Sequence, residues 1–201
     1  MKINVAKTCA GIAGLLILLL GLSCGGSDKS QQDICNCVPT QSPESDFRHN
    51  AKHVPLPSAM PAEINVDTIL SWPLGPDPAF DAPRQGRELQ LFHISRAFLE
   101  FAWERPEDCD LTLEISQVPD KTAPRVIVET PIESEYCSAR RQLQKQLAGL
   151  GEQLNTNSGE LHQPRQVEVT GLAFRDFAHG RGTAVVATLW ELHPAVVNVT
   201  Q

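Results

Sequence analysis

Polar and apolar residues alternate along the second half of the chain in a way that predicts β-strands. The clearest segment is 109–116, CDLTLEIS, in which every second residue is apolar and points to one face. Segments 125–130, 165–174 and 184–194 have related patterns and are separated by turn residues. In segment 87–104 the apolar positions change from even to odd numbers. A flat strand does not permit this change, so the segment predicts a long first strand with a bulge.

One segment between the third and fourth predicted strands has a helical period instead. Tyr136, Leu143, Leu147 and Leu150 recur on one face, and glycines follow at the C-terminal end. The predicted order is therefore β-β-β-α-β-β. This is the order of an OB-fold, a small five-stranded Greek-key barrel with a helix between strands three and four. We expect an all-β domain with one helix, with the barrel formed by residues 87–197.

The N-terminal part of the chain lacks this alternation. An apolar run of signal-peptide length, AGIAGLLILLLGL, follows two lysines and is too short to be a good membrane span. The next segment is polar and rich in proline, with no apolar period, and predicts an extended tether. The expected organisation is a signal peptide at 1–23, a tether at 24–62 and an OB-like domain at 63–201.

The sequence GLSC that ends the apolar run resembles the cleavage site of bacterial lipoproteins. The resemblance implies cleavage before Cys24, lipid on its sulfur and anchoring at the cell envelope. Gly25 after the cysteine implies the outer membrane where the cell has one. The pattern departs at Gly21, where lipoproteins prefer leucine. Two alternatives stay open, namely release as a soluble secreted protein by ordinary signal peptidase and an uncleaved anchor.

Charge and motifs narrow the possible functions. Without residues 1–23 the chain has 15 basic and 24 acidic residues, a net charge of −9. Nucleic-acid binding is not expected, because phosphates require a basic face. The Arg140, Arg141 and Lys145 cluster is interpreted as one solvated helix face. There is no P-loop, G-x-S-x-G, H-E-x-x-H or dinucleotide fingerprint. We therefore expect no cofactor and assign no catalytic residue.

Cysteines provide a further constraint. Apart from Cys9 in the signal and Cys24, four remain, an even number that predicts disulfides in an oxidising compartment: Cys35, Cys37, Cys109 and Cys137. If Val118 faces Arg125 in the hairpin of the second and third strands, Cys109 lies close to the start of the helix. We therefore predict a Cys109–Cys137 disulfide. This leaves Cys35 and Cys37 for another disulfide role, including one between chains.

Several stretches of the domain together resemble a loosely defined family of small secreted bacterial proteins with an OB-like barrel. The stretches are WPLGPDP, DCDLTLEI, VIVETP, VEVTGLAF and WELHP, and the likeness covers about residues 63–197. The chain departs from the family pattern near its end, where GTAVVATLW stands between HGR and ELHP. The resemblance implies the fold and an exported location, and it implies no activity.

The last two predicted strands contain the candidate site. Asp176, His179, Glu191 and His193 supply two imidazoles and two carboxylates, which suit a divalent metal. The competing interpretation is structural, because the outer face of a barrel hairpin is normally polar and His179-Gly180 suits a turn. We expect a non-enzymatic binding role with a protein, glycan or small ligand at the envelope. The alternative is a nuclease-like, metal-dependent hydrolase that uses these four residues.

Overall fold

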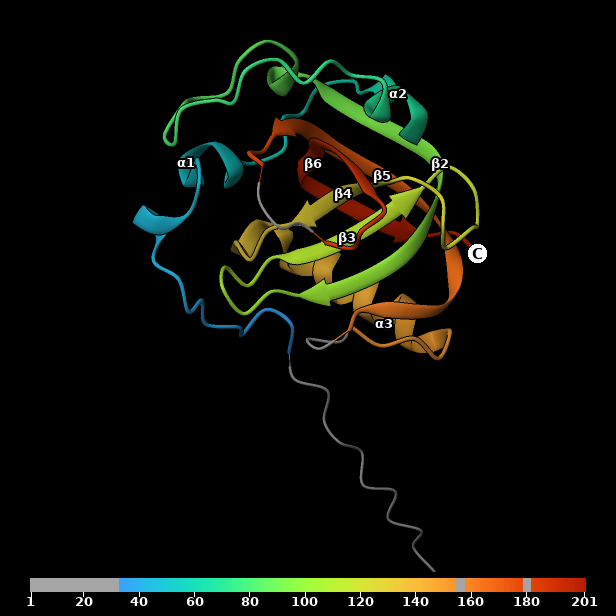
Figure 1. Ribbon diagram of the computed structural model, residues 1–201. Coiled ribbons are helices and arrows are strands. Elements are labelled where there is room, and N and C mark those ends of the chain that lie inside the picture. Colours follow the sequence, from blue (N-terminus) through green and yellow to red (C-terminus); the bar gives the residue numbers. More distant parts are fainter. Residues whose placement is uncertain (1–32, 155–157, 179–181) are drawn as a thin grey trace, which may run out of the picture. The chain divides into compact units, whose positions relative to one another are not determined.

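Five strands close into a barrel, and one longer helix lies across its end (Figure 1). The computed structural model describes residues 33–154, 158–178 and 182–201. The barrel strands are β2 (Leu91–Glu104), β3 (Leu111–Ser116), β4 (Arg125–Thr130), β5 (Glu160–Arg175) and β6 (Val186–Val199). They pair in the order β2-β3-β4-β6-β5, and β5 returns to β2 to close the ring. Only β4 and β6 run parallel among these five. The predicted OB-like β-β-β-α-β-β class is confirmed.

The predicted helix is α3, Cys137–Gly149, between β4 and β5. Its Leu143 and Leu147 are buried in the barrel core, as their spacing predicts, whereas Leu150 lies beyond the helix and is exposed. The remaining elements are short: α1 (His49–Lys52), α2 (Val66–Leu70), the strand β1 (Ala62–Glu63) and three 3₁₀ turns (Pro43–Ser45, Gly86–Leu89 and Ser134–Tyr136). Within the described residues, no helix is both long and apolar enough to span a bilayer.

The predicted bulge in the first barrel strand is confirmed, and there is a second one. The pairing of β2 with β5 shifts register between Ile94 and Ala97 and again between Leu99 and Phe101. Leu99 therefore lies in the core, while Phe101 and Trp103 are only partly buried. The second bulge explains why these two aromatic residues do not join the core that their odd numbers predicted.

The long strand β5 contains a third irregularity, at the glycine that the sequence marks. The register with β6 shifts between Gly171 and Ala173. A Cβ atom on Gly171 would lie 2.6 Å from the Cβ of Ala195 and 2.9 Å from the carbonyl oxygen of Pro194. Glycine is therefore required here by the close approach of the β6 backbone.

Both faces of β3 are buried, although alternation predicted one solvated face. Leu111, Leu113 and Ile115 face the core as expected. The opposite residues Asp110, Thr112, Glu114 and Ser116 are also buried, each 0–1% exposed. Two segments outside the barrel cover this outer face: the N-terminal segment 33–54 and the loop before β6, where Thr183 donates hydrogen bonds to Glu114. The polar residues of β3 thus form a second, charged interior layer.

The N-terminal segment 33–54 packs on the barrel, which its tether-like composition did not predict: Ile34, Phe47, Arg48, Ala51 and Lys52 are buried. Two disulfides fasten it there, Cys35–Cys137 and Cys37–Cys109. The predicted Cys109–Cys137 disulfide is therefore wrong. The hairpin register also differs by two residues, because Ser116 rather than Val118 faces Arg125.

The physical reason is that Cys109, just before β3, and Cys137, at the start of α3, each bond to a cysteine of a segment without periodicity. That segment adds further contacts, since Arg140 donates to the carbonyl oxygen of Ile34, 2.8 Å from Nη2. Arg140 is fully buried, which corrects its placement on a solvated helix face, whereas Arg141 is exposed as predicted. Phe47 and Ala51 pack against Phe174. Local patterns do not encode such contacts, because they depend on a distant surface.

Candidate functional site

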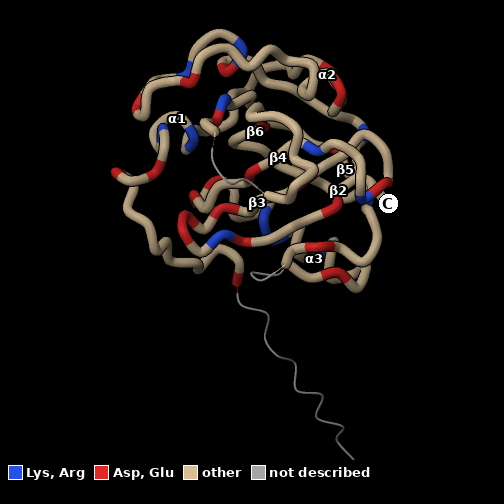
Figure 2. Tube along the Cα trace, in the orientation of Figure 1, with Lys and Arg blue, Asp and Glu red and all other residues tan. Residues whose placement is uncertain are grey.

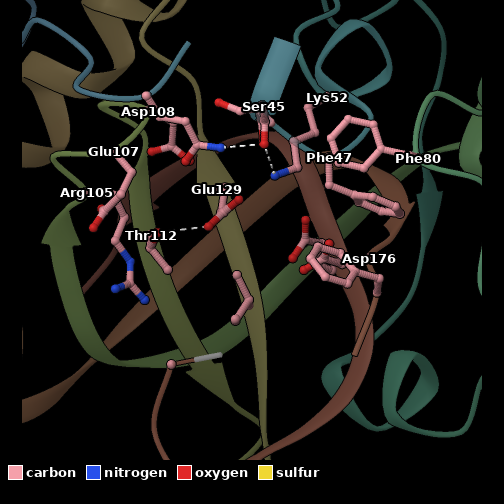
Figure 3. A pocket seen from close by; sticks show the side chains of 16 residues that line it. Ser45, Phe47, Lys52, Phe80, Arg105, Glu107, Asp108, Thr112, Glu129 and Asp176 are labelled. Atoms are coloured by element: carbon pink, nitrogen blue, oxygen red, sulfur yellow. Dashed lines mark hydrogen bonds and ion pairs between the residues drawn. The ribbon is translucent and has the colours of Figure 1, made fainter. Parts of the chain in front are cut away.

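A cavity of about 370 Å³ lies on the outer face of β3, β4 and β6, beneath the N-terminal segment. Figure 3 shows Glu107 and Asp108 on one side, Phe47 and Phe80 on the opposite side, and Glu129 between them. Thr112 donates a hydrogen bond of 2.8 Å to Glu129 Oε1 and so orients this carboxylate. The strands thus supply a polar floor, and the N-terminal segment and the loops before β2 and β3 supply the walls.

Acidic residues outnumber basic ones around this cavity. Among the described residues that line it, six are acidic and two are basic: Asp46, Glu107, Asp108, Glu129, Asp176 and Glu191 against Lys52 and Arg105. Figure 2 shows acidic positions gathered between α1 and the neighbouring end of β3. An excess of negative charge in a partly enclosed space favours a cation there, because field lines are focused by the low-dielectric walls.

His193 lies behind the cavity floor, among three carboxylates. Its Nε2 is 3.2 Å from Asp110 Oδ2, and its Nδ1 is 2.9 Å from Glu129 Oε2 and 3.6 Å from Glu191 Oε1. The side chains of His193 and Asp110 are completely buried. Burial alone would lower the pKa of His193, but the contacts with Asp110, Glu129 and Glu191 raise it well above its usual value. The three carboxylates therefore favour the protonated form of His193.

A second histidine, His53, approaches from the N-terminal segment. Its Nδ1 is 2.6 Å from Glu133 Oε1, its Nε2 is 3.5 Å from Asp46 Oδ2, and its ring centroid is 5.8 Å from that of His193. Burial opposes the charged form, yet the contacts with Asp46 and Glu133 raise its pKa to about 9. The charges of the two imidazoles and of their carboxylates therefore influence one another.

The pKa shifts of Asp108 and Lys52 agree with an excess of negative charge around the cavity. Burial raises the pKa of Asp108 to about 7, and the charges of Asp110 and Glu129 add to this shift. Burial would lower the pKa of Lys52, but Glu129 is the first of several carboxylates that raise it instead. A carboxyl group that resists ionisation beside an ammonium that holds its proton indicates that added positive charge is stabilised here.

The structure brings together part of the site that the sequence predicted. Glu191 and His193 lie in contact, and Asp176 lines the same cavity as Glu191. His179 lies outside the described residues, as does the predicted lipidation site Cys24. In the described part of the chain, the groups with metal-donor spacing are Asp46–His49–His53, His53–Asp110–His193 and Glu129–Glu191–His193. Asp176 belongs to none of them.

Three residues of the site were missed at the level of sequence: His53, Asp110 and Glu129. A signal for Glu129 was present, because an OB-fold pairs β4 in parallel with β6. Ile127 faces Glu191 and Val128 faces Leu192, so Glu129 necessarily comes close to His193. Asp110 is next to the first pair of the β3–β4 hairpin. His53 had no such signal, since it lies in the segment interpreted as a tether.

Comparisons of the chain with models of protein families, with characterised proteins and with solved structures find no match. The functional argument therefore depends on the geometry of the cavity and of the histidine pair. The two disulfides add that the domain matures in an oxidising compartment outside the cytoplasm.

Proposed function

We propose that the protein is an exported, lipid-anchored OB-like domain with a non-enzymatic binding role, and that its ligand is a small organic cation. The observation that carries the proposal is the acidic cavity on the outer face of β3, β4 and β6. OB-folds use the face of their second and third strands and the adjoining loops for ligands, and these strands correspond to β3 and β4. Because a fold does not determine a function, the chemistry of the cavity has to identify the ligand class.

The cavity combines carboxylates with aromatic rings. Phe47 stacks near Phe80 and Phe177, with ring centroids 5.9 Å and 4.5 Å away. Phe80 is half exposed at the rim. An ammonium group is attracted by the faces of aromatic rings and by carboxylates, and an alkyl chain packs on the same rings. An amine with a short aliphatic chain therefore matches both kinds of wall.

The proposed anchor at Cys24 gives the domain a short connection to the membrane. The first disulfide fixes the chain at Cys35, eleven residues after Cys24. Even a fully extended connection of this length spans only about 40 Å. The predicted tether of residues 24–62 would have reached much further. The proposal thus places the barrel within about one domain diameter of the lipid headgroups.

Calorimetric titration of the full chain with putrescine tests the ligand class, with the corresponding uncharged diol as comparator. We expect saturable one-to-one binding of the diamine, weakened by salt, and no binding of the diol. Phe80→Ala should weaken binding by about two- to fivefold, and Asp108→Asn should weaken it further. Asp67→Asn removes an exposed carboxylate on α2, away from the cavity, and should change nothing. Absence of saturable binding, or equal binding by all variants, contradicts the proposal.

The metal-dependent hydrolase is the second candidate, favoured by the contact of His193 with Glu191. Its test is the release of nitrophenolate from bis(para-nitrophenyl) phosphate with added divalent metals. Release that requires metal and is lost in Glu191→Gln supports this candidate. Protein that binds putrescine and releases no nitrophenolate with any metal supports the binding role instead.

A further inference from the structure

We propose that His53, Asp110 and His193 form a binding site for a divalent transition metal, with zinc as the best fit. The site lies beneath the organic-cation cavity and uses different side chains, so it does not depend on the proposed ligand. One donor comes from the N-terminal segment, one precedes β3 and one lies on β6. A bound metal ion would therefore join the N-terminal segment to the barrel.

The three donor atoms are already close to one another. All lie within 4.8 Å, and His193 Nε2 and Asp110 Oδ2 are 3.2 Å apart. Zinc binds nitrogen and oxygen donors at about 2.0–2.2 Å in tetrahedral sites, which places neighbouring donors roughly 3.3 Å apart. The His193–Asp110 pair has this spacing without any movement. His53 completes the set by a small shift of the segment that carries it.

The contacts between these groups are ion pairs rather than well-aligned hydrogen bonds. Both ring nitrogens of His193, both of His53 and Oδ2 of Asp110 are buried and lack an aligned hydrogen-bond partner. The pair of the exposed His162 and the buried Glu152 differs, since its atoms form a hydrogen bond at 3.0 Å. Buried polar atoms normally form aligned hydrogen bonds, and contacts with poorer alignment recover less free energy. Convergence of such atoms on one point is the arrangement that a metal ion satisfies.

Further carboxylates hold the donors in place. Glu129 lies 2.9 Å from Nδ1 of His193, and Glu133 lies 2.6 Å from Nδ1 of His53. Histidines that bind metals commonly present their other ring nitrogen to a carboxylate, which orients the ring. The remaining oxygen of Asp110, Oδ1, accepts a hydrogen bond of 3.1 Å from the Ile132 amide. Each proposed donor thus has a contact that points its free atom inward.

The chemistry of the three donors indicates which metal ion fits the site. Two imidazoles and one carboxylate suit zinc better than calcium or magnesium, which prefer oxygen donors. A small cavity of about 180 Å³ is lined by His53, Asp46 and Asp108, so it borders one of the three proposed donors. A dication would also offset the surplus of carboxylates that surrounds the histidines.

Titration of the full chain with Co²⁺ and Zn²⁺ tests the site. The protein is purified without chelator and without a polyhistidine tag. We expect one ion per chain by elemental analysis after dialysis, and a visible Co²⁺ spectrum of tetrahedral type that added Zn²⁺ abolishes. His53→Gln and Asp110→Asn should weaken binding by about tenfold or more, and Glu133→Gln should weaken it within about 10- to 100-fold. His162→Ala, which removes an exposed histidine in contact with the buried carboxylate of Glu152, is the matched control.

Two outcomes overturn the proposal. One is a wild-type chain that retains no more zinc than the His53→Gln variant after dialysis. The other is a loss of binding in His162→Ala equal to that in Asp110→Asn. Circular dichroism of each variant separates unfolding from loss of a donor, and His53, on the N-terminal segment, is the safer substitution. Because zinc and putrescine are titrated separately, failure of one proposal leaves the other result readable.

Discussion

Arg48 and Glu88 form a two-point ion pair inside the protein. Nη1 of the arginine lies 2.7 Å from Oε1 and Nη2 lies 2.9 Å from Oε2, and both side chains are buried. The same guanidinium donates to the carbonyl oxygens of Ala82, Pro83 and Arg175. One side chain of the N-terminal segment thus fastens that segment to the loop before β2 and to the end of β5.

Replacement of this arginine should be costly. We expect Arg48→Ala to lower the free energy of unfolding by about 3–5 kcal/mol, because it leaves Glu88 buried without its counter-charge. Urea denaturation followed by tryptophan fluorescence measures this loss. Arg141→Ala is the control, since Arg141 pairs with Asp33 at the surface and its loss should hardly move the unfolding midpoint. Equal midpoints for both variants would refute the role of Arg48.

The same ion pair predicts a dependence of stability on acid. Burial opposes ionisation of Glu88, but Arg48 and the Arg175 amide outweigh it and lower its pKa below the ordinary 4.5. Since the folded pKa is the lower one, this contribution is complete above about pH 4.5 and is lost as the pH falls towards the folded pKa. Glu88→Gln should therefore lose less stability than wild type between pH 5 and pH 3, roughly the window in which Glu88 takes up its proton. Parallel stability curves would contradict the assignment.

The disulfides should stabilise the domain by closing long loops. The double variant Cys37→Ser/Cys109→Ser should lose about 2–5 kcal/mol of unfolding free energy, and the segment before Phe47 should become sensitive to protease. Peptide mapping under non-reducing conditions checks the pairing directly. Recovery of a Cys109–Cys137 peptide would show that the tertiary arrangement of the N-terminal segment is wrong.

The anchor has a separate test in living cells. Cys24→Ser should abolish incorporation of labelled palmitate and move the protein from the membrane to the soluble fraction. Since Cys24 takes no part in either disulfide, unfolding midpoints of the variant and the wild type should agree. Labelling that persists in Cys24→Ser would exclude this cysteine as the lipid site.

The alternation of side chains was sufficient to predict the barrel. The strand at 109–116, the bulge in 87–104 and the glycine at 171 each leave a local mark, because a strand with one face in a core has period two. The helix was equally predictable from the helical spacing of Leu143 and Leu147. The candidate site was only half predictable, since Glu191 and His193 share a strand but their partners come from other segments.

The sequence by itself determined the order of elements, the closed barrel and an even number of cysteines available for disulfides, because period, turn residues and composition are local properties. Only the tertiary structure decided that residues 33–54 pack on the barrel, that Cys35 and Cys37 pair with Cys137 and Cys109, and that His53 lies beside His193. From the alternation of residues alone, the polar outer face of β3 would be expected to face solvent. It is buried because two segments far away in the chain, the N-terminal segment and the loop before β6, cover it.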